Sequence, residues 1–428
     1  MSVQVLPEYA QYRKFVMNWP LAVSALFLCC SFVTKNAQAG VPTSRSDMNA
    51  PTSAPTPVQA MGAGNQTLFN FSFHLSKEDT ILYSYKDHPK YLPDSHAKSM
   101  AFTQDGRYLN VGIRSILDKG DEDLYGGEYV TFDIRRFSDP VEVDETKFRH
   151  GFNYDEQYSP DGRLLVSINQ DGQIRIDNVE DMKNPKHLST LPWPDGQASC
   201  VTISRDGKFM VVGGRNKVFR VYDISNPLKP LEQSKTEAGH LLYDVALSPE
   251  GKWVVFVGNG FRLKVYDLSD LTAPKIMNTE KFPEDDDGVW TVSVAISPDS
   301  KWLAVAGYTE HHSLLIYNME SPGNPKLMRV EEIERPISFV DISRDGSLMA
   351  IGALGINSGV TIFDVIYPDQ PLQVSFIKAN NAAGWVDGAF SPVKDELVVD
   401  LNSKELELYK YKYSPDPFSN TSDTFKQR

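Results

Sequence analysis

Three aspartates, Asp155, Asp244 and Asp387, recur at one position of a repeated pattern, four residues before a turn. Carboxylates at one height of a fold could bind a cation or polarise a water molecule, which is the chemistry that a catalytic role needs. A structural role is the simpler interpretation, because a buried aspartate accepts backbone N–H groups and fixes the packing of neighbouring units. The other copies carry Ser99, Cys200, Ser293 and Phe339 here. We therefore expect structural aspartates and keep catalysis as the alternative.

A second group of residues suits the recognition of another protein, because it combines carboxylates with large aromatic rings. Its acidic members are Asp118, Asp121, Asp123, Glu284, Asp285, Asp286 and Asp287, and its aromatic members are Trp193, Trp290 and Trp385. We predict that these side chains bind a protein partner, which could present a basic segment. Two alternatives stay open: the acidic runs are solvated loops, and the tryptophans plug the core.

Metal and cofactor sites find little support in the sequence. Calcium is a weak possibility at Glu284–Asp287, since this run lacks the D-x-D-x-D-G spacing of an EF-hand. His311 and His312 form an isolated pair, which offers too few ligands for a metal site. The chain contains no G-x-S-x-G nucleophile motif, no phosphate-binding G-x-x-x-x-G-K-[ST] and no H-E-x-x-H. We expect no cofactor.

The composition narrows the class of protein. Of 428 residues, 41% are hydrophobic and 23% are charged, which is typical of a globular chain. The formal net charge is −13. A surface this acidic repels the phosphates of nucleic acids and anionic lipids, so we expect neither as a partner.

The N-terminal segment predicts export. Arg13 and Lys14 precede an apolar run from Phe15 to Val33, and small residues follow at Ala37 and Ala39. This order is typical of a cleaved signal peptide over residues 1–39, with a retained membrane anchor as the alternative. Residues 40–66, rich in Pro, Ala, Ser and Thr, predict a flexible linker. The mature protein would then be periplasmic or secreted, without stable membrane insertion, and would keep Cys200 as its single cysteine.

A turn motif recurs through the rest of the chain and organises it. Its seven copies begin at Thr103, Ser159, Ser204, Ser248, Ser297, Ser343 and Ser391, at spacings of 44 to 56 residues. The residues, as in Ser-Pro-Asp-Gly, are those of a type I turn. Short β-rich runs flank each turn, and two more strands follow it. Four strands per unit without helical periodicity predict the blade of a β-propeller.

The repeats also resemble a known group. SPDGRLLVSINQDGQIRIDNVED and SRDGKFMVVGGRNKVFRVYDISNP are similar to units of LVIVD-type and Trp-Asp-repeat (YVTN-like) β-propellers. The shared feature is an aspartate or asparagine after the third strand, at Asp133, Asp177, Asp223, Asp267, Asn318 and Asp364. The resemblance implies an all-β ring of seven blades and carries no catalytic constellation. Some looser-repeat propellers are hydrolases or lactonases, with a site at the channel mouth.

Ring closure is the remaining question about the fold, because an open ring leaves two sheet edges unpaired. We predict a seven-bladed propeller over residues 67–413, followed by a polar tail over 414–428. The last unit lacks a good fourth strand. The run Thr80–Lys86 would fill this gap, so that an N-terminal strand pairs in the last blade; Phe418–Phe425 is the alternative.

The loops identify a binding face. Loops that join second to third strands, and fourth strands to the next blade, open on one face of a propeller. The insertion Ile113–Glu128 and the acidic run Glu284–Asp287 both fall on such loops. We therefore expect an exported, non-enzymatic platform that binds another protein through an acidic and aromatic loop face. A hydrolase or lactonase using Asp155, Asp244 and Asp387 is the alternative.

Overall fold

The computed structural model describes most of the repeat region. The described residues are 72–82, 96–118, 123–148, 153–169, 172–194, 196–281, 290–308, 314–333, 335–355, 358–379, 386–401 and 405–414. The chain divides into two units, residues 1–69 and 70–428, and all described residues belong to the second. The predicted signal peptide and linker therefore lie outside the described residues, as does the predicted tail beyond Ser414.

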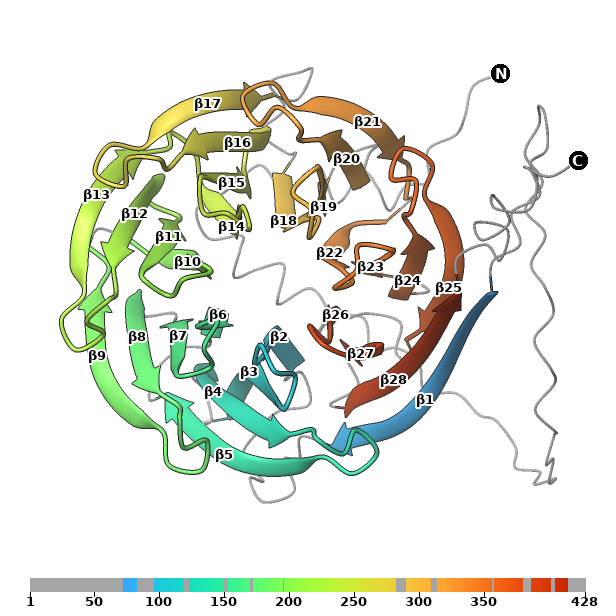
Figure 1. Cartoon of the computed structure of the whole chain (residues 1–428). Helices are drawn as coiled ribbons and strands as arrows, with labels where there is room; N and C mark the ends of the chain where they lie inside the picture. The colour runs from blue at the N-terminus through green and yellow to red at the C-terminus, as the bar shows by residue number, and fades with distance from the viewer. Residues whose placement is uncertain are drawn as a thin grey trace, which may run out of the picture. The chain divides into compact units, whose positions relative to one another are not determined.

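The described residues form seven four-stranded antiparallel sheets, which Figure 1 shows as the blades of a ring. Blade 1 contains β2 (His96–Phe102), β3 (Tyr108–Asp118), β4 (Asp123–Asp133) and β5 (Val141–Phe148). Blade 2 contains β6 (Asn153–Tyr158), β7 (Leu164–Asn169), β8 (Gln173–Asn178) and β9 (Lys186–Pro192). Blade 3 contains β10 (Ala198–Ile203), β11 (Phe209–Gly214), β12 (Val218–Asp223) and β13 (Leu231–Glu237).

Blade 4 contains β14 (Leu242–Leu247), β15 (Trp253–Gly258), β16 (Phe261–Asp267) and β17 (Lys275–Glu280). Blade 5 contains β18 (Trp290–Ile296), β19 (Trp302–Tyr308), β20 (Leu314–Asn318) and β21 (Lys326–Glu331). Blade 6 contains β22 (Ile337–Ile342), β23 (Leu348–Ala353), β24 (Gly359–Asp364) and β25 (Leu372–Lys378). Blade 7 contains β26 (Asp387–Phe390), β27 (Glu396–Asp400), β28 (Glu405–Ser414) and β1 (Ser72–Leu82). The predicted all-β, seven-bladed propeller is confirmed.

The repeated turn joins the first two strands of each blade, and its side chains explain why. In blade 2 the Ser159 hydroxyl donates to the Asp161 carboxylate (2.6 Å) and accepts the backbone N–H of Leu164 (2.9 Å). Gly162 closes the turn with a φ of 70°, in the left-handed region that favours glycine. The backbone N–H of Gly162 donates to the carbonyl of Ser159 (2.8 Å). Each turn is thus specified locally, and the chain reverses at the same point in every repeat.

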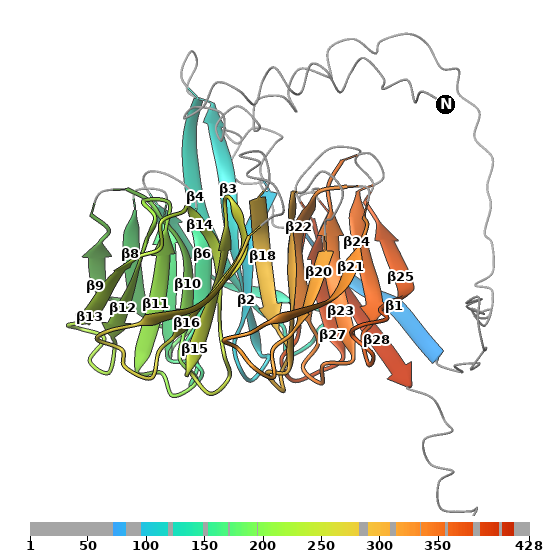
Figure 2. The same ribbon diagram turned by 90° about the horizontal axis from the view of Figure 1, so that it is seen from above.

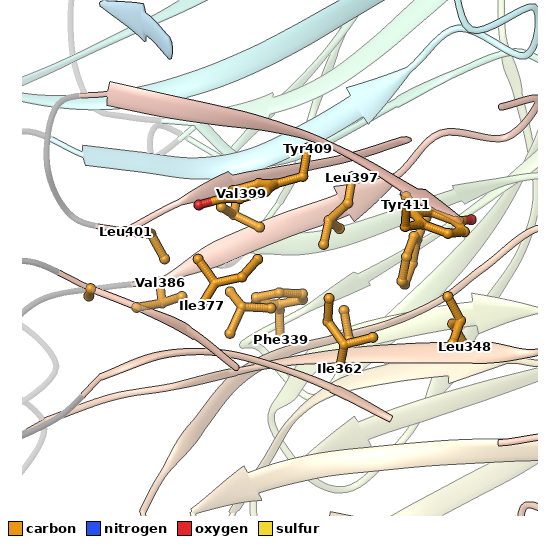
Figure 3. Close-up of a cluster of buried hydrophobic side chains, with 14 residues drawn as sticks. Phe339, Leu348, Ile362, Ile377, Val386, Leu397, Val399, Leu401, Tyr409 and Tyr411 are labelled. Carbon is orange, nitrogen blue, oxygen red and sulfur yellow. The ribbon is translucent and has the colours of Figure 1, made fainter. Parts of the chain in front are cut away.

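The core lies between the faces of adjacent blades. Figure 3 shows one such cluster, in which Phe339, Leu348 and Ile362 of blade 6 face Leu397 and Tyr411 of blade 7. Strands buried on both faces read as continuous apolar runs; β15, for example, is buried at every position. The single cysteine of the repeat region, Cys200, is buried in the cluster between blades 3 and 4. Burial and strand pairing therefore hold this ring together.

An N-terminal strand completes the last blade, as predicted. β1 pairs antiparallel with β28 along its whole length, from Ser72 opposite Ser414 to Leu82 opposite Glu405. The position of this strand differs from the prediction, because it begins at Ser72 and includes Thr80–Leu82 of the expected run Thr80–Lys86, whose remaining residues lie outside the described part of the chain. The polar residues before Thr80 hid the strand, since β1 has one face toward solvent and alternates rather than being uniformly apolar.

The insertion in blade 1 extends the sheet. We expected a loop between Ile113 and Glu128, but β3 and β4 continue to pair until Asp118 lies opposite Asp123. Figure 2 shows this hairpin projecting past the strand ends of the other blades, on the side where second strands lead to third strands. Within the described residues every regular element is a strand, and none of them forms a helix long and apolar enough to cross a membrane.

Candidate functional site

The innermost strands surround the centre of the ring, and carboxylates on three of them link a blade to the next one. Asp155 on β6 accepts the backbone N–H of Val201 in blade 3 (2.8 Å) with one oxygen. Its other oxygen accepts the N–H of Glu156 (2.8 Å). Asp244 on β14 repeats this pattern with Val294 in blade 5 (2.9 Å). These carboxylates accept hydrogen bonds from backbone N–H groups that have no neighbouring strand on the channel side.

The same link recurs two residues further along the inner strands. Asp341 on β22 accepts the N–H of Phe390 in blade 7 (2.8 Å), and Gln157 on β6 accepts the N–H of Ile203 in blade 3 (2.5 Å). Ser293 uses its hydroxyl at the position of the predicted aspartates, accepting the N–H of Val340 in blade 6 (3.2 Å). Inter-blade linkage through side-chain acceptors is therefore a general device of this ring.

The predicted aspartates lie within electrostatic reach of one another. Burial raises the pKa of Asp155 to about 8, and the charges of Asp244 and Asp387 raise it further. Burial also raises the pKa of Asp244 to about 6. Asp387 accepts the N–H of Gly388 (2.8 Å). Among the described residues, no group of three or more His, Cys, Asp or Glu side chains is arranged to hold a metal ion.

A β-bulge at one end of the innermost strands turns a side chain out of the ladder. The bulge recurs between Ala97 and Ser99, Asn153 and Asp155, Ala198 and Cys200, Leu242 and Asp244, Thr291 and Ser293, and Ile337 and Phe339. The bulged residue is Tyr154 in blade 2 and Tyr243 in blade 4. A bulge redirects the side chain that it carries, so both rings are free to reach blade 3 between them.

Arg215 of blade 3 contacts both of these rings. It lies in the turn between β11 and β12, and its Cζ lies 5.0 Å from the ring centroid of Tyr154 and 5.6 Å from that of Tyr243. Its backbone N–H donates to the carbonyl of Gln197 (2.8 Å), whose side chain accepts the Tyr154 hydroxyl (3.3 Å). The distances from Cζ to the two ring centroids are within the range of cation–π contacts. We call Tyr154, Arg215 and Tyr243 the tyrosine–arginine clamp.

Basic residues continue from the clamp across the same face. Lys217 ends the Arg215 turn, and its carbonyl accepts the N–H of Ala238 (2.7 Å) in the connection to blade 4. The Lys264 ammonium donates to the carbonyl of Ala238. Burial lowers the pKa of His240, and the charges of Lys264, Lys217 and Lys281 lower it further. We call Lys217, His240, Lys264 and Lys281 the basic ridge.

The predicted acidic residues fall largely outside the described part of the chain. Asp121 and Glu284–Asp287 lie outside it, as do His311, His312 and Trp385. Asp118 and Asp123 face each other across the end of the β3–β4 ladder, and Trp290 begins β18. The structure therefore places three backbone positions of this group.

Trp193 lies inside the protein. Its exposed fraction is 5%, and it belongs to the apolar cluster between blades 2 and 3. The Arg220 guanidinium lies over its ring at 5.4 Å from the centroid. A partner could not reach this ring without opening the blade interface, so its position matches the core-plug alternative rather than a partner contact.

One position of the repeat alignment needs correction. Leu164 pairs with Asn178 as Phe209 pairs with Asp223, so Asn178, not Asp177, follows the third strand of blade 2. Asp177 is instead fully buried, where its carboxylate accepts the Tyr129 hydroxyl of blade 1 (3.1 Å) and the Arg175 Nε (2.6 Å). Adjacent Asp and Asn residues made the one-residue shift invisible in the sequence.

The clamp was missed in the sequence, although one signal was present. Tyr154 and Tyr243 both stand five residues before the turn serine, where the other blades carry no aromatic residue but Lys98, Ser199, Val292, Ser338 and Val386. Two tyrosines at equivalent places, with an arginine in the blade between them, would have identified the group. The contact depends on bulges and on the angle between blades, which the strand pattern does not contain.

Comparison with known proteins agrees with this architecture. A family model for the WD domain, G-beta repeat, matches residues 185–223, which span β9 to β12. The β-propeller domain of Cps50 (Swd1) from Myceliophteria thermophila is similar in structure, with a TM-score of 0.57 and 12% identity. That match covers 75% of this chain and 98% of the other. No curated protein matches the chain in sequence. The protein is therefore a seven-bladed β-propeller that carries a WD-type repeat.

Proposed function

We propose that the protein is an interaction platform that binds another protein through the face formed by its second-to-third-strand loops. The tyrosine–arginine clamp is the observation that carries this proposal. It places two aromatic rings and a guanidinium, from three different blades, on one face, and all three side chains are partly exposed. Tyrosine and arginine are the residue types that most often dominate protein interfaces. A propeller with a WD-type repeat is consistent with such a role.

The finer parts of the proposal come from the sequence. The carboxylates around Asp118–Asp123 and at Glu284–Asp287 fit a partner with a basic segment. The leader over residues 1–39 fits an exported protein, periplasmic or secreted. The repeats remain similar to the LVIVD type, which tolerates Tyr-Asp or Phe-Asp where the strict repeat has Trp-Asp.

A steric block on one face tests the proposed platform. Lys217→Cys places a thiol on the loop face, and Arg205→Cys places one in the turn at the opposite end of blade 3; both lysine and arginine are exposed. In a C29S/C30S background, buried Cys200 is protected and each new thiol accepts a maleimide–polyethylene glycol chain. We expect the modified K217C protein to lose the partner that the unmodified protein captures. The modified R205C protein keeps it. The proposal would be contradicted if both modified proteins lost partner capture equally, or if neither lost it.

A hydrolase at the channel mouth is the second candidate. The pKa of about 8 at Asp155 favours it, because a general acid must be protonated near neutral pH. Against it, both oxygens of Asp155 already accept backbone N–H groups. We therefore favour the platform. Stoichiometric metal in the purified protein, lost together with a hydrolytic activity in D155N, would reverse this preference.

A further inference from the structure

The blade 3 and blade 4 part of the loop face carries a group of basic side chains, although the protein as a whole has a net charge of −13. Arg215, Lys217 and Lys281 all reach the surface there, and Lys217 and Lys281 are exposed. Lys217 holds its place with a φ of 67°, which few residues other than glycine adopt. A lysine is thus kept on a strained turn, beside other cations. Together these charges produce a local positive potential, which attracts a negatively charged partner.

The guanidinium of Arg215 has unused hydrogen-bonding capacity. Its Nε is buried and has no hydrogen-bond partner, and none of the described carboxylates forms an ion pair with it. A buried donor without an acceptor is costly. Because Nε itself is out of reach, an acceptor from outside would bind the terminal nitrogens of this partly exposed side chain. The two tyrosine rings hold the guanidinium in place before any ligand arrives, which reduces the entropy lost on binding.

Three carboxyl groups of blades 2, 3 and 4 do not act as its counter-ions. Asp155 follows Tyr154 and Asp244 follows Tyr243, but both direct their oxygens to backbone N–H groups of the next blade. The carboxylate of Glu237, at the end of β13, lies 3.5 Å from the Lys235 ammonium. These three carboxylates are therefore engaged elsewhere.

The basic ridge extends the positive potential around Arg215. Its residues do not compete with Arg215 for direct contact with a ligand. Lys264 is buried and donates to the carbonyl of Ala238, so it contributes charge rather than a contact. Burial and the neighbouring lysines lower the pKa of His240, which keeps its imidazole from adding charge near neutral pH. Lys217 and Lys281 are left as the exposed cations, one on each side of the blade 3–blade 4 boundary.

We propose that the tyrosine–arginine clamp binds a carboxylate of an acidic segment in the partner protein, with Arg215 as the direct contact and Lys217 and Lys281 as long-range attraction. This inference rests on the proposed platform and specifies its chemistry. A planar guanidinium matches a carboxylate with two parallel hydrogen bonds, which a lysine cannot reproduce. An acidic protein segment fits better than a nucleic acid, because the rest of the molecule repels a long polyanion.

Fluorescence anisotropy with a labelled hexaglutamate peptide tests the proposal on the full chain. We expect Arg215→Gln to weaken binding about tenfold or more, and Arg215→Lys to recover only part of the loss. The matched control is Arg205→Gln, which removes the same charge from the opposite face of blade 3 and leaves affinity within about twofold. K217Q and K281Q reduce the salt dependence of binding more than they reduce affinity at high salt.

Three outcomes would overturn the inference. They are equal affinities for R215Q and the unmodified chain, an equal loss in R205Q, and tighter binding of an oligothymidylate or of hexaglutamine than of hexaglutamate. The melting temperature of R215Q controls for folding of the clamp. If the loop-face block abolishes partner capture while R215Q leaves the peptide affinity unchanged, the platform stands and the carboxylate site does not.

Discussion

The carboxylate of Asp244 in blade 4 accepts the backbone N–H of Val294 in blade 5, at 2.9 Å, while it also accepts the N–H of Val245, at 2.7 Å. One side chain thus joins two innermost strands that share no ladder. Innermost strands have an open edge toward the channel, and an unpaired N–H group there is costly when water is excluded. The link stabilises the ring where backbone pairing cannot.

Asp244→Asn is expected to lower the free energy of unfolding by about 1–3 kcal/mol, because the amide nitrogen cannot accept the second N–H group. Urea unfolding at pH 7 measures this loss. Asp369→Asn, at an exposed turn of blade 6, is the control and changes stability by less than about 0.5 kcal/mol. Partner binding at the loop face is unchanged in both variants. A lost binding activity with normal stability would instead support a functional aspartate.

The stability of the ring depends on pH through Asp155. Its pKa rises from 3.8 to about 8 on folding, so the folded chain binds this proton more tightly than the unfolded chain. That stabilisation is complete below about pH 4 and is lost as the pH rises through about 8. The free energy of unfolding, relative to D155N, is therefore expected to fall between pH 4 and pH 8. Parallel pH profiles for the two proteins would contradict this.

The charge of Asp244 is part of the cause of that shift, which gives an independent measurement. In D244N one negative charge near Asp155 is removed, so the pKa of Asp155 is expected to move down. Carboxyl carbon chemical shifts across a pH titration report the change. An Asp155 pKa that stays the same in D244N would show that burial alone raises it.

Closure by β1 predicts the effect of two truncations. A chain that starts at residue 83 lacks the partner of β28 and is expected to lose about 3 kcal/mol or more of stability relative to one that starts at residue 70. A synthetic peptide of residues 70–82 restores part of the melting temperature. Removal of residues 415–428 leaves the melting temperature nearly unchanged. A large loss in the second truncation only would favour closure by Phe418–Phe425.

The turn of blade 5 offers a stabilising substitution. Ser300 adopts a φ of 61°, where four of the other turns place a glycine with φ between 64° and 71° and a fifth has Gly346 at 73°. Ser300→Gly is expected to raise the free energy of unfolding by about 0.5–1 kcal/mol by relieving this strain. Gly207→Ala is the reverse experiment, because an added Cβ meets nothing within 4 Å and only backbone strain changes. Gly207→Ala is expected to lower the free energy of unfolding by a similar amount. If this substitution raised the free energy of unfolding or left it unchanged, backbone strain would not explain the effect.

Local chemistry determined much of this protein. A serine or threonine, an acidic residue and a glycine at fixed offsets specify most of the turns by contacts within six residues, so seven copies, one of them degenerate, predicted seven blades and their strand order. The inner-strand aspartates could be located for the same reason, since their distance from the turn is constant. The N-terminal strand was predicted by elimination, but its bounds were not, because an edge strand alternates polar and apolar residues.

The tertiary structure decided what lies between blades. Tyr154, Arg215 and Tyr243 are separated by 61 and 28 residues in the chain and meet only because two bulges redirect side chains toward the blade between them. The N–H partners of Asp155 and Asp244 belong to the next repeat, and the burial of Trp193 follows from the packing of blade 2 on blade 3. Residue spacing encodes contacts along one strand or turn, whereas contacts across the ring depend on the angle at which complete sheets pack.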